Sequence, residues 1–406
     1  MARKKTVLLM TVGTGIGDGE ALSHGIFYSI ESHNPDKIFF FGSEASKSTI
    51  IHIHDEIIED YDGYEFIEIE NIDDFKEYFN AIKSKIIEFV DEKVVIDYTS
   101  GTKTMTMAAA FASMIYHKNL VFVSGKREGG IVKSGTEKII SQNLYPVYDD
   151  LMLEKVKELF NSNRFEAGKV LLSDIVESDD KEIYTQLFDI YYNFDNINYQ
   201  KAFDLFTIDF LNEVISRFPD LKAQLYQNRM ALQTIVQKNH KLRCYCILAS
   251  LLNNAKRRYG EGKYDDAIAR LYRSFELIAQ IRLKEKYNIK TSKVDLESLK
   301  KRGLTDEYLD TLDSCRSDLN EDVKIGLIKD YDLLYHLDDD LGIFYSENYN
   351  DITECSSFRN KSILAHGLNY QTEEEYLKFE KLVLEAANIL TKDLDKYLNQ
   401  TLFPEF

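Results

Sequence analysis

The feature that most constrains the fold is a change in hydrophobic pattern near residue 148. Before this point, short apolar runs rich in β-branched residues alternate with amphipathic stretches, which is typical of a parallel β-sheet with crossover helices. After it, the chain contains only amphipathic runs with apolar residues at helical spacing. We therefore predict an α/β Rossmann-like N-terminal domain followed by an all-α C-terminal region.

The N-terminal part predicts strands covered on both faces, because their apolar runs are nearly continuous. An apolar stripe predicts a core-facing helix over residues 73–90, and small residues predict a closely packed helix over 106–118. The last strand is the weakest in pattern, and one arm of a hairpin is an alternative for it. The expected strands are 6–13, 36–42, 64–70, 93–99, 119–125 and 137–147.

The length of 406 residues exceeds the ~250 to 300 residues over which one core usually grows, so several domains are expected. We place the α/β domain at 1–147, a helical connector at 148–240 and a second helical domain at 241–406. The boundary near 240 has no Pro/Gly/Ser linker and is set where the run HKLRCYCILASLLNNAKRRY begins. The clearest expected helices beyond the α/β domain are 151–161, 263–287 and 373–398.

The overall charge limits the ways in which this chain can bind nucleic acid. A formal net charge of -18 disfavours a broad phosphate-binding surface, so any polyanion must be captured at a focused basic or backbone site. The N-terminus has neither a run long enough for a transmembrane helix nor a signal-peptide cleavage pattern. We therefore expect a cytoplasmic protein with no membrane partner, and reduced thiols at its four cysteines.

Two turns at the carboxyl ends of predicted strands have the composition of an anion site. The first is rich in glycine, and the second combines hydroxyls, a glycine, a cation and a helix N-terminus. In open α/β sheets, ligands bind at this edge. The residues are Gly13, Thr14 and Gly15 in the first turn, and Ser100, Gly101, Thr102 and Lys103 in the second.

Neither turn is a recognised nucleotide motif by itself. A dinucleotide fingerprint would need glycine at the position of Asp18, and no Walker sequence occurs. A turn that needs flexible backbone explains the first loop equally well. Ser100 or Thr102 could simply cap the following helix.

The stretch SFRNKSILAHGL contains the candidate catalytic residues Arg359, Asn360 and His366. If 352–368 is one helix, Arg359 and His366 are seven positions apart and share a face two turns apart, with Asn360 about 100° round. Histidine can exchange protons near neutral pH, arginine can stabilise a phosphorane-like charge, and asparagine can position phosphate or ribose. The alternative is an ordinary solvated face.

No metal site is predicted. His52 and His54 could present two imidazoles, but local sequence supplies no further ligands, and the acidic run 336–342 lacks EF-hand spacing and is expected at the surface.

Taken together, these motifs resemble the CRISPR type III accessory ribonucleases in which a CRISPR-associated Rossmann-fold (CARF) sensor precedes a HEPN ribonuclease domain. The resemblance covers nearly the whole chain. Its specific parts are VGTG at 12–15, DYTSGTKTM at 97–105, the helix at 267–283, and RNKSILAH at 359–366, which fits the family's R-x4-6-H pattern.

The resemblance implies an endoribonuclease that is activated by a cyclic oligoadenylate, tetra- or hexa-adenylate, bound across a CARF homodimer. It assigns ligand contact to the residues of the two turns and cleavage of single-stranded RNA to Arg359, Asn360 and His366, at a site shared between two HEPN domains. Cleavage needs no metal and leaves 2',3'-cyclic phosphate and 5'-hydroxyl ends. Lys126 and Arg127 are further ligand candidates.

Three alternatives stay open on the sequence. The first concerns three polar residues of the helix at 267–283, Tyr272, Arg273 and Glu276, which support either the catalytic residues or the dimer interface. Alternatively, Arg273 and Glu276 simply form an i,i+3 surface pair. The chain could be a nucleotide-sensing regulatory or scaffold protein without nuclease activity. The CARF domain could also degrade its own ligand slowly, with help from Thr14 or Ser100.

Overall fold

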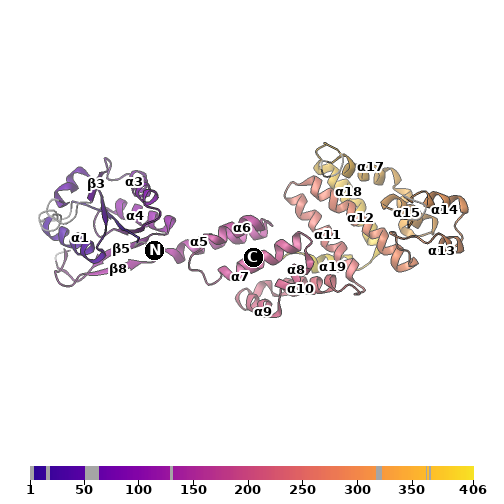
Figure 1. Cartoon of the computed structure of the whole chain (residues 1–406), viewed down its shortest axis with the longest axis horizontal. Helices are drawn as coiled ribbons and strands as arrows, with labels where there is room; N and C mark the ends of the chain where they lie inside the picture. The colour runs from indigo at the N-terminus through magenta and orange to yellow at the C-terminus, as the bar shows by residue number, and fades with distance from the viewer. Residues whose placement is uncertain are drawn as a thin grey trace. The chain divides into compact units, whose positions relative to one another are not determined.

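The computed structural model describes residues 4–14, 19–50, 64–128, 131–316, 322–362, 364 and 367–406. The chain forms two compact units. The first contains Met1–Lys155 and Ser173–Asp179, and the second contains Val156–Leu172 and Asp180–Phe406. Figure 1 shows the first unit around a β-sheet and the second unit built from helices. The predicted fold class, Rossmann-like and then all-α, is confirmed.

The first unit contains a six-stranded sheet in the order β3-β2-β1-β4-β5-β8. The strands β1 to β5 pair in parallel, whereas β8 pairs antiparallel with β5, so the sheet is mixed. Strand order changes direction between β1 and β4, which makes their carboxyl ends the switch point where such sheets bind ligands. The strands are β1 (Thr6–Thr11), β2 (Lys37–Gly42), β3 (Tyr64–Glu68), β4 (Lys93–Asp97), β5 (Asn119–Ser124) and β8 (Lys138–Gln142), with a separate pair β6 (Arg127–Glu128) and β7 (Ile131–Val132).

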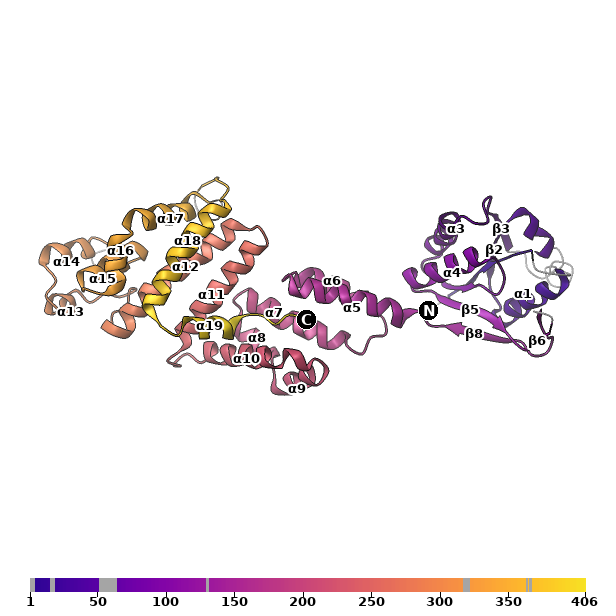
Figure 2. The same ribbon diagram turned by 180° about the vertical axis from the view of Figure 1, so that it is seen from behind.

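Helices cover both faces of the sheet, because successive residues of each strand point to opposite sides (Figures 1 and 2). In β1, Val7 and Leu9 pack with α3 (Phe75–Glu88) and α4 (Lys103–Tyr116). Leu8 and Met10 pack with α1 (Gly19–His33) on the other side. Both sets of side chains are almost fully buried, and this burial holds β1 and its carboxyl end in place.

Five of the six predicted strands end earlier than expected, and local hydrogen bonds explain two of these ends. Residues 98–99 leave β4 because the Asp97 carboxylate accepts a hydrogen bond from the Thr99 backbone N–H at 2.6 Å, which forms a local turn. The strand expected over 137–147 stops at Gln142, and α5 (Tyr145–Asn161) already begins at Tyr145. Asn143 Oδ1 accepts from the Tyr145 N–H at 3.0 Å, so its side chain starts this helix.

The second unit contains helices throughout, and beyond β8 the described residues form isolated bridges but no strand. Its main hydrophobic core surrounds α12 (Tyr264–Tyr287), which packs against α11, α15, α17 and α18. The first helices are α6 (Phe165–Ser173), α7 (Lys181–Asp195), α8 (Tyr199–Leu205), α9 (Ile208–Arg217) and α10 (Lys222–Val236). They continue as α11 (Arg243–Gly260), α13 (Leu296–Lys301), α14 (Asp306–Asp313), α15 (Leu327–His336), α16 (Asp340–Glu347), α17 (Tyr349–Lys361), α18 (Glu373–Leu390) and α19 (Leu394–Thr401).

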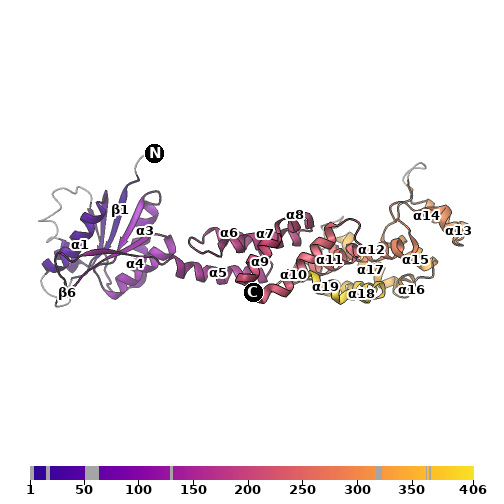
Figure 3. The same ribbon diagram turned by 90° about the horizontal axis from the view of Figure 1, so that it is seen from below.

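The helix expected over 373–398 is in fact two helices, α18 and α19, which Figure 3 labels separately. Thr391 adopts an extended conformation with φ -148° and ψ 141°, and its Oγ1 accepts from the Asp393 N–H at 3.2 Å. The hydroxyl thus competes with helical bonding and breaks the run.

Among the described residues, no helix is both long enough and apolar enough to cross a membrane.

Candidate functional site

The two predicted anion-binding turns lie side by side at the switch point of the sheet. Strands β1 and β4 are parallel neighbours, with Met10 opposite Asp97. The Gly13 backbone N–H donates to Ser100 Oγ at 3.0 Å, and Thr11 Oγ1 donates to the Ser100 carbonyl. Ser100 is 5% exposed and therefore acts mainly as the link between the loops.

Glycine is required at both loops because their backbones touch. A Cβ at Gly13 would lie 3.0 Å from the Gly101 Cα. Gly101 has φ +123°, and a Cβ there would lie 2.8 Å from Met105 Sδ. The close contact between the loops is thus a structural reason for these glycines that does not involve a ligand.

The surface groups at this edge are those of an anion site. Thr102 caps α4, since its Oγ1 accepts from the Met105 N–H at 3.3 Å, as the capping alternative expected. Lys103 follows as the first helical residue and is exposed, as is Thr14 on the neighbouring loop. The positive end of α4 and the Lys103 ammonium therefore act together on any anion bound there.

A buried polar network supports the second loop from below. The Asp97 carboxylate is 1% exposed and accepts hydrogen bonds from the Ser29 hydroxyl on α1 and from Thr99. Burial raises the pKa of Asp97, and these hydrogen bonds oppose the rise. Thr99 Oγ1 in turn accepts from the Val123 N–H of β5 at 2.8 Å. Asp97 was not among the predicted site residues, and its position at a strand end was its only signal in the sequence.

The remaining ligand candidates have different positions. Gly15 lies outside the described residues. Lys126 and Arg127 are exposed just after β5, and the Lys126 N–H donates to Thr136 Oγ1 at 3.1 Å.

In the second unit, Arg359 is held against α12. It lies in the last turn of α17, and its guanidinium carbon is 5.3 Å from the centroid of the Tyr272 ring. Burial raises the pKa of Tyr272, the charge of Glu276 adds to the rise, and Arg359 opposes it. The aromatic face thus fixes the cation at the side of α12.

The expectation that 352–368 forms one helix is wrong, because α17 ends at Lys361. Ser362 is extended, with φ -69° and ψ 151°. The helical spacing that starts at Arg359 therefore does not extend beyond Lys361. Asn360 belongs to α17, and His366 lies outside the described residues.

The polar residues of α12 form a surface pair next to a buried acid. Arg273 Nη1 donates to Glu276 Oε2 at 2.7 Å and to Gln280 Oε1 at 3.1 Å, so the i,i+3 pair is present. Asp330 on α15 is fully buried, and neither of its carboxylate oxygens has a hydrogen-bond partner among the described residues. Burial, reinforced by the charge of Glu276 and opposed by Arg273, raises the pKa of Asp330 to about 8. Nothing in its sequence context distinguished Asp330.

The expectation of a solvated acidic run at 336–342 is wrong for Asp339, which is fully buried. Its carboxylate accepts from Lys286 Nζ at 2.7 Å, from the Tyr287 hydroxyl at 3.0 Å and from the Leu341 N–H at 3.0 Å. It therefore caps α16. The pair His52 and His54 lies outside the described residues.

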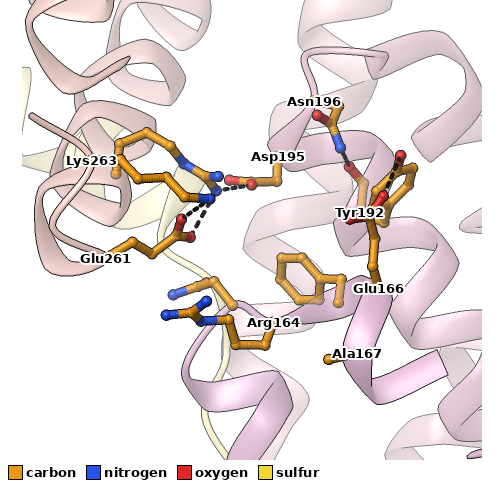
Figure 4. A pocket seen from close by; sticks show the side chains of 11 residues that line it. Arg164, Glu166, Ala167, Tyr192, Asp195, Asn196, Glu261 and Lys263 are labelled. Carbon is orange, nitrogen blue, oxygen red and sulfur yellow. Dashed lines mark hydrogen bonds and ion pairs between the residues drawn. The ribbon is translucent and has the colours of Figure 1, made fainter. Parts of the chain in front are cut away.

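A cavity of about 250 Å³ lies where α6, α7, α11 and α12 meet (Figure 4). Asp195 is central to it and accepts from Asn254 Nδ2 and from the guanidiniums of Arg257 and Arg258. Glu261 pairs with Lys263 at 2.8 Å. The charges in this cavity largely balance one another, and none of the predicted site residues lines it.

Two family models match the helical part of the chain in adjoining segments. The Csm6 6H domain matches residues 148–238, and the Csm6 HEPN domain matches residues 236–390. The chain belongs to the CARF-HEPN family of type III CRISPR accessory proteins. The predicted resemblance is thereby confirmed, and the family match supports a ribonuclease of the HEPN class.

One solved structure agrees with this family at the level of the fold. Csm6 from Enterococcus italicus, bound to cyclic hexa-2'-fluoro-hexa-dAMP, matches with a TM-score of 0.63 and 16% identity, over 98% of this chain and 99% of that one. Can2 from Sulfobacillus thermosulfidooxidans, in complex with cyclic tetra-adenylate, has a TM-score of 0.26 and 12% identity, over 54% and 68% of the two chains. The second TM-score is too low for a comparison of folds. The curated proteins gave no match.

Proposed function

We propose that this chain senses a cyclic oligoadenylate with its first unit and cuts single-stranded RNA with its second, as a cytoplasmic type III CRISPR ribonuclease. The observation that carries the proposal is that the segment matched by the HEPN model contains Arg359, Asn360 and His366. The anion-binding edge between β1 and β4 in the same chain supports the sensing role.

The activator binds at the edge formed by the two turns, with cyclic tetra-adenylate or hexa-adenylate as the candidates. The helix N-terminus of α4 and the exposed Lys103 supply positive potential for its phosphates. The proposed contacts are Gly13, Thr14, Gly15, Ser100, Gly101, Thr102 and Lys103.

RNA is cut by attack of the 2'-hydroxyl on the adjacent phosphorus, with breakage of the bond from phosphorus to the 5'-oxygen. His366 takes the proton of the 2'-hydroxyl, and the leaving 5'-oxygen receives a proton from the imidazolium so formed, while Arg359 stabilises the extra negative charge. Asn360 positions the phosphate or ribose. The products carry a 2',3'-cyclic phosphate and a 5'-hydroxyl, and no step requires a metal ion.

The working form is a homodimer, and an apolar stripe on α4 supports this. Met107, Phe111 and Ile115 are four positions apart, share one face of the helix and are 49%, 45% and 41% exposed. Covering such a stripe with a second copy would bring two activator sites together, since each α4 begins at one. Replacing Phe111 with Glu should shift the molar mass in light scattering from dimer to monomer.

The function is tested with full-length protein and labelled single-stranded RNA in EDTA, with and without each cyclic oligoadenylate. We expect activator-dependent cleavage with cyclic phosphate ends, and its loss in Arg359→Ala and in His366→Ala. Arg302→Ala and His336→Ala are matched controls, since both residues are exposed in the same unit and lie outside the motif. If the activator raises the melting temperature but no RNA is cut, the chain is a sensor without nuclease activity.

A further inference from the structure

The segment that follows Arg359 is tied to α12 by a second contact. Ser362, 1% exposed, donates from its Oγ to Asp265 Oδ1 at 2.5 Å. The other carboxylate oxygen of Asp265 accepts from the backbone N–H of Gln371 at 3.5 Å. One carboxylate on α12 therefore contacts both ends of the segment 362–371.

Ser362 also contacts three described residues that follow it, Leu364, Gly367 and Asn369. Its carbonyl accepts from the Gly367 N–H and its Oγ accepts from the Leu364 N–H, both at 3.1 Å. It forms an isolated parallel bridge with Asn369. On the other side, the Ser362 N–H donates to the carbonyl of Arg359 at 3.3 Å. One buried serine thus joins the turn that holds Arg359 to Leu364, Gly367 and Asn369.

The two contacts match the geometry of the helices. Asp265 and Tyr272 are seven residues apart on α12 and so lie on one face, two turns apart. They contact Ser362 and Arg359 respectively, which are three residues apart at the end of α17. The helices α12 and α17 run in opposite directions across this contact, so α12 holds the chain at Arg359 and at Ser362.

We infer that Asp265 and Ser362 are positioning residues, through which α12 holds Ser362 and Gln371, the two ends of the segment 362–371, in place relative to Arg359. The inference rests on the proposed ribonuclease function, in which His366, lying within that segment in the sequence, acts together with Arg359. A hydrogen bond to a carboxylate is stronger than one between neutral groups and holds its partner in one orientation. Small displacements of a reacting group are enough to lower a rate strongly.

Asp266 provides a matched control on the next position of the chain. It has the same charge and lies in the same first turn of α12, but its carboxylate pairs with Arg270 of its own helix at 3.0 Å. A general effect of acidic residues at the start of α12 would appear in both variants. We call the two hydrogen bonds that Asp265 accepts from Ser362 and Gln371 the anchor. An effect of the anchor would appear only in Asp265→Ala.

The test uses full-length protein with cyclic tetra- and hexa-adenylate and single-stranded RNA. We expect Asp265→Ala to lower kcat by about 10- to 100-fold with little change in KM. The shape of the pH–rate profile should stay the same, because Asp265 transfers no proton. Asp266→Ala should change kcat less than about twofold. Ser362→Ala should resemble Asp265→Ala, and Ser362→Thr, which keeps the hydroxyl, should restore most of the rate.

Hydrogen exchange of the peptide 362–372 provides a readout that does not depend on activity. In Asp265→Ala its backbone amides should exchange faster, while those of Asp266→Ala should match the parent. Asp265→Asn keeps an acceptor for Ser362 and guards against the case that Asp265→Ala does not fold. Its exchange rate in this peptide should lie between those of the parent and Asp265→Ala. Unchanged exchange in Asp265→Ala, or equal effects at Asp265 and Asp266, overturns the inference.

The failure of the anchor and that of the proposed function can be told apart. If Arg359→Ala and His366→Ala abolish cleavage while Asp265→Ala cuts like the parent, the anchor is wrong and the function stands. If the parent cuts no RNA with any activator, the function is wrong, and faster exchange in Asp265→Ala would still support the structural anchor.

Discussion

The guanidinium of Arg359 lies over the ring of Tyr272, with 5.3 Å between the guanidinium carbon and the ring centroid. The ring is half-buried on α12, so it offers a fixed surface to the last turn of α17. An aromatic face contacts a guanidinium without using its N–H donors, which are the groups that bind phosphate. The stacking is thus compatible with the role proposed for this arginine.

We predict that Tyr272→Leu lowers the rate of activated RNA cleavage about two- to fivefold, since a cation over an aromatic face near the surface contributes about 0.5 to 1 kcal/mol. Tyr272→Phe keeps the ring face and should change the rate less. Single-turnover cleavage assays measure both. Equal rates for the Leu and Phe variants would show that the ring face has no part in holding Arg359.

We predict that Gly101→Ala destabilises the first unit by about 1 to 3 kcal/mol and weakens the activator-induced rise in melting temperature, because φ is +123° and the new Cβ would lie 2.8 Å from Met105 Sδ. Gly135→Ala is the control. Gly135 also has a positive φ, +79°, but no atom within 4 Å of a built Cβ. Thermal unfolding with and without cyclic oligoadenylate separates steric crowding from backbone strain. Equal losses in both variants would contradict the crowding at the loops.

We predict a pH-dependent effect at Asp330, whose pKa burial raises from 3.8 to about 8. Between these two values the folded protein keeps a proton that the unfolded chain has lost. This group therefore lowers the free energy of unfolding as pH rises, by at most about 1.4 kcal/mol per pH unit, and its effect levels off above pH 8.

Asp330→Asn removes this titration. The stability of the variant relative to the parent should therefore rise from pH 5 to pH 8, as measured by urea unfolding at both values. A difference that stays constant with pH would mean that the carboxyl titrates alike in the folded and unfolded chains.

We predict that Asp195→Ala destabilises the second unit by about 3 to 5 kcal/mol, because it leaves the buried guanidinium of Arg257 without its carboxylate and leaves Arg258 with Glu261 alone. Asp189→Ala on the same helix is the control. Its pair with Lys169 is 36% and 40% exposed and should contribute no more than about 1 kcal/mol. Urea unfolding measures both, and similar losses would show that burial does not distinguish the two pairs.

The sheet edge formed by the two turns after β1 and β4 was predictable because its sequence signals are local. A glycine-rich turn after one strand and a hydroxyl-rich turn before a helix can each be recognised within a few residues, and parallel strands bring their carboxyl ends to one edge. The geometry of Arg359 could not be predicted in this way. The shared face of Arg359 and His366 depended on the condition that 352–368 is one helix, whereas α17 ends at Lys361.

The sequence by itself determined the Rossmann-like and helical halves, the two turns and the residue types of the motif, because hydrophobic period and turn chemistry act between near neighbours. Only the tertiary structure decided that Asp265 contacts Ser362 and that Asp330 is buried without a hydrogen-bond partner among the residues that the structure describes. Asp265 and Ser362 are 97 positions apart. A contact at such a separation depends on how α12 and α17 pack, which no local pattern encodes.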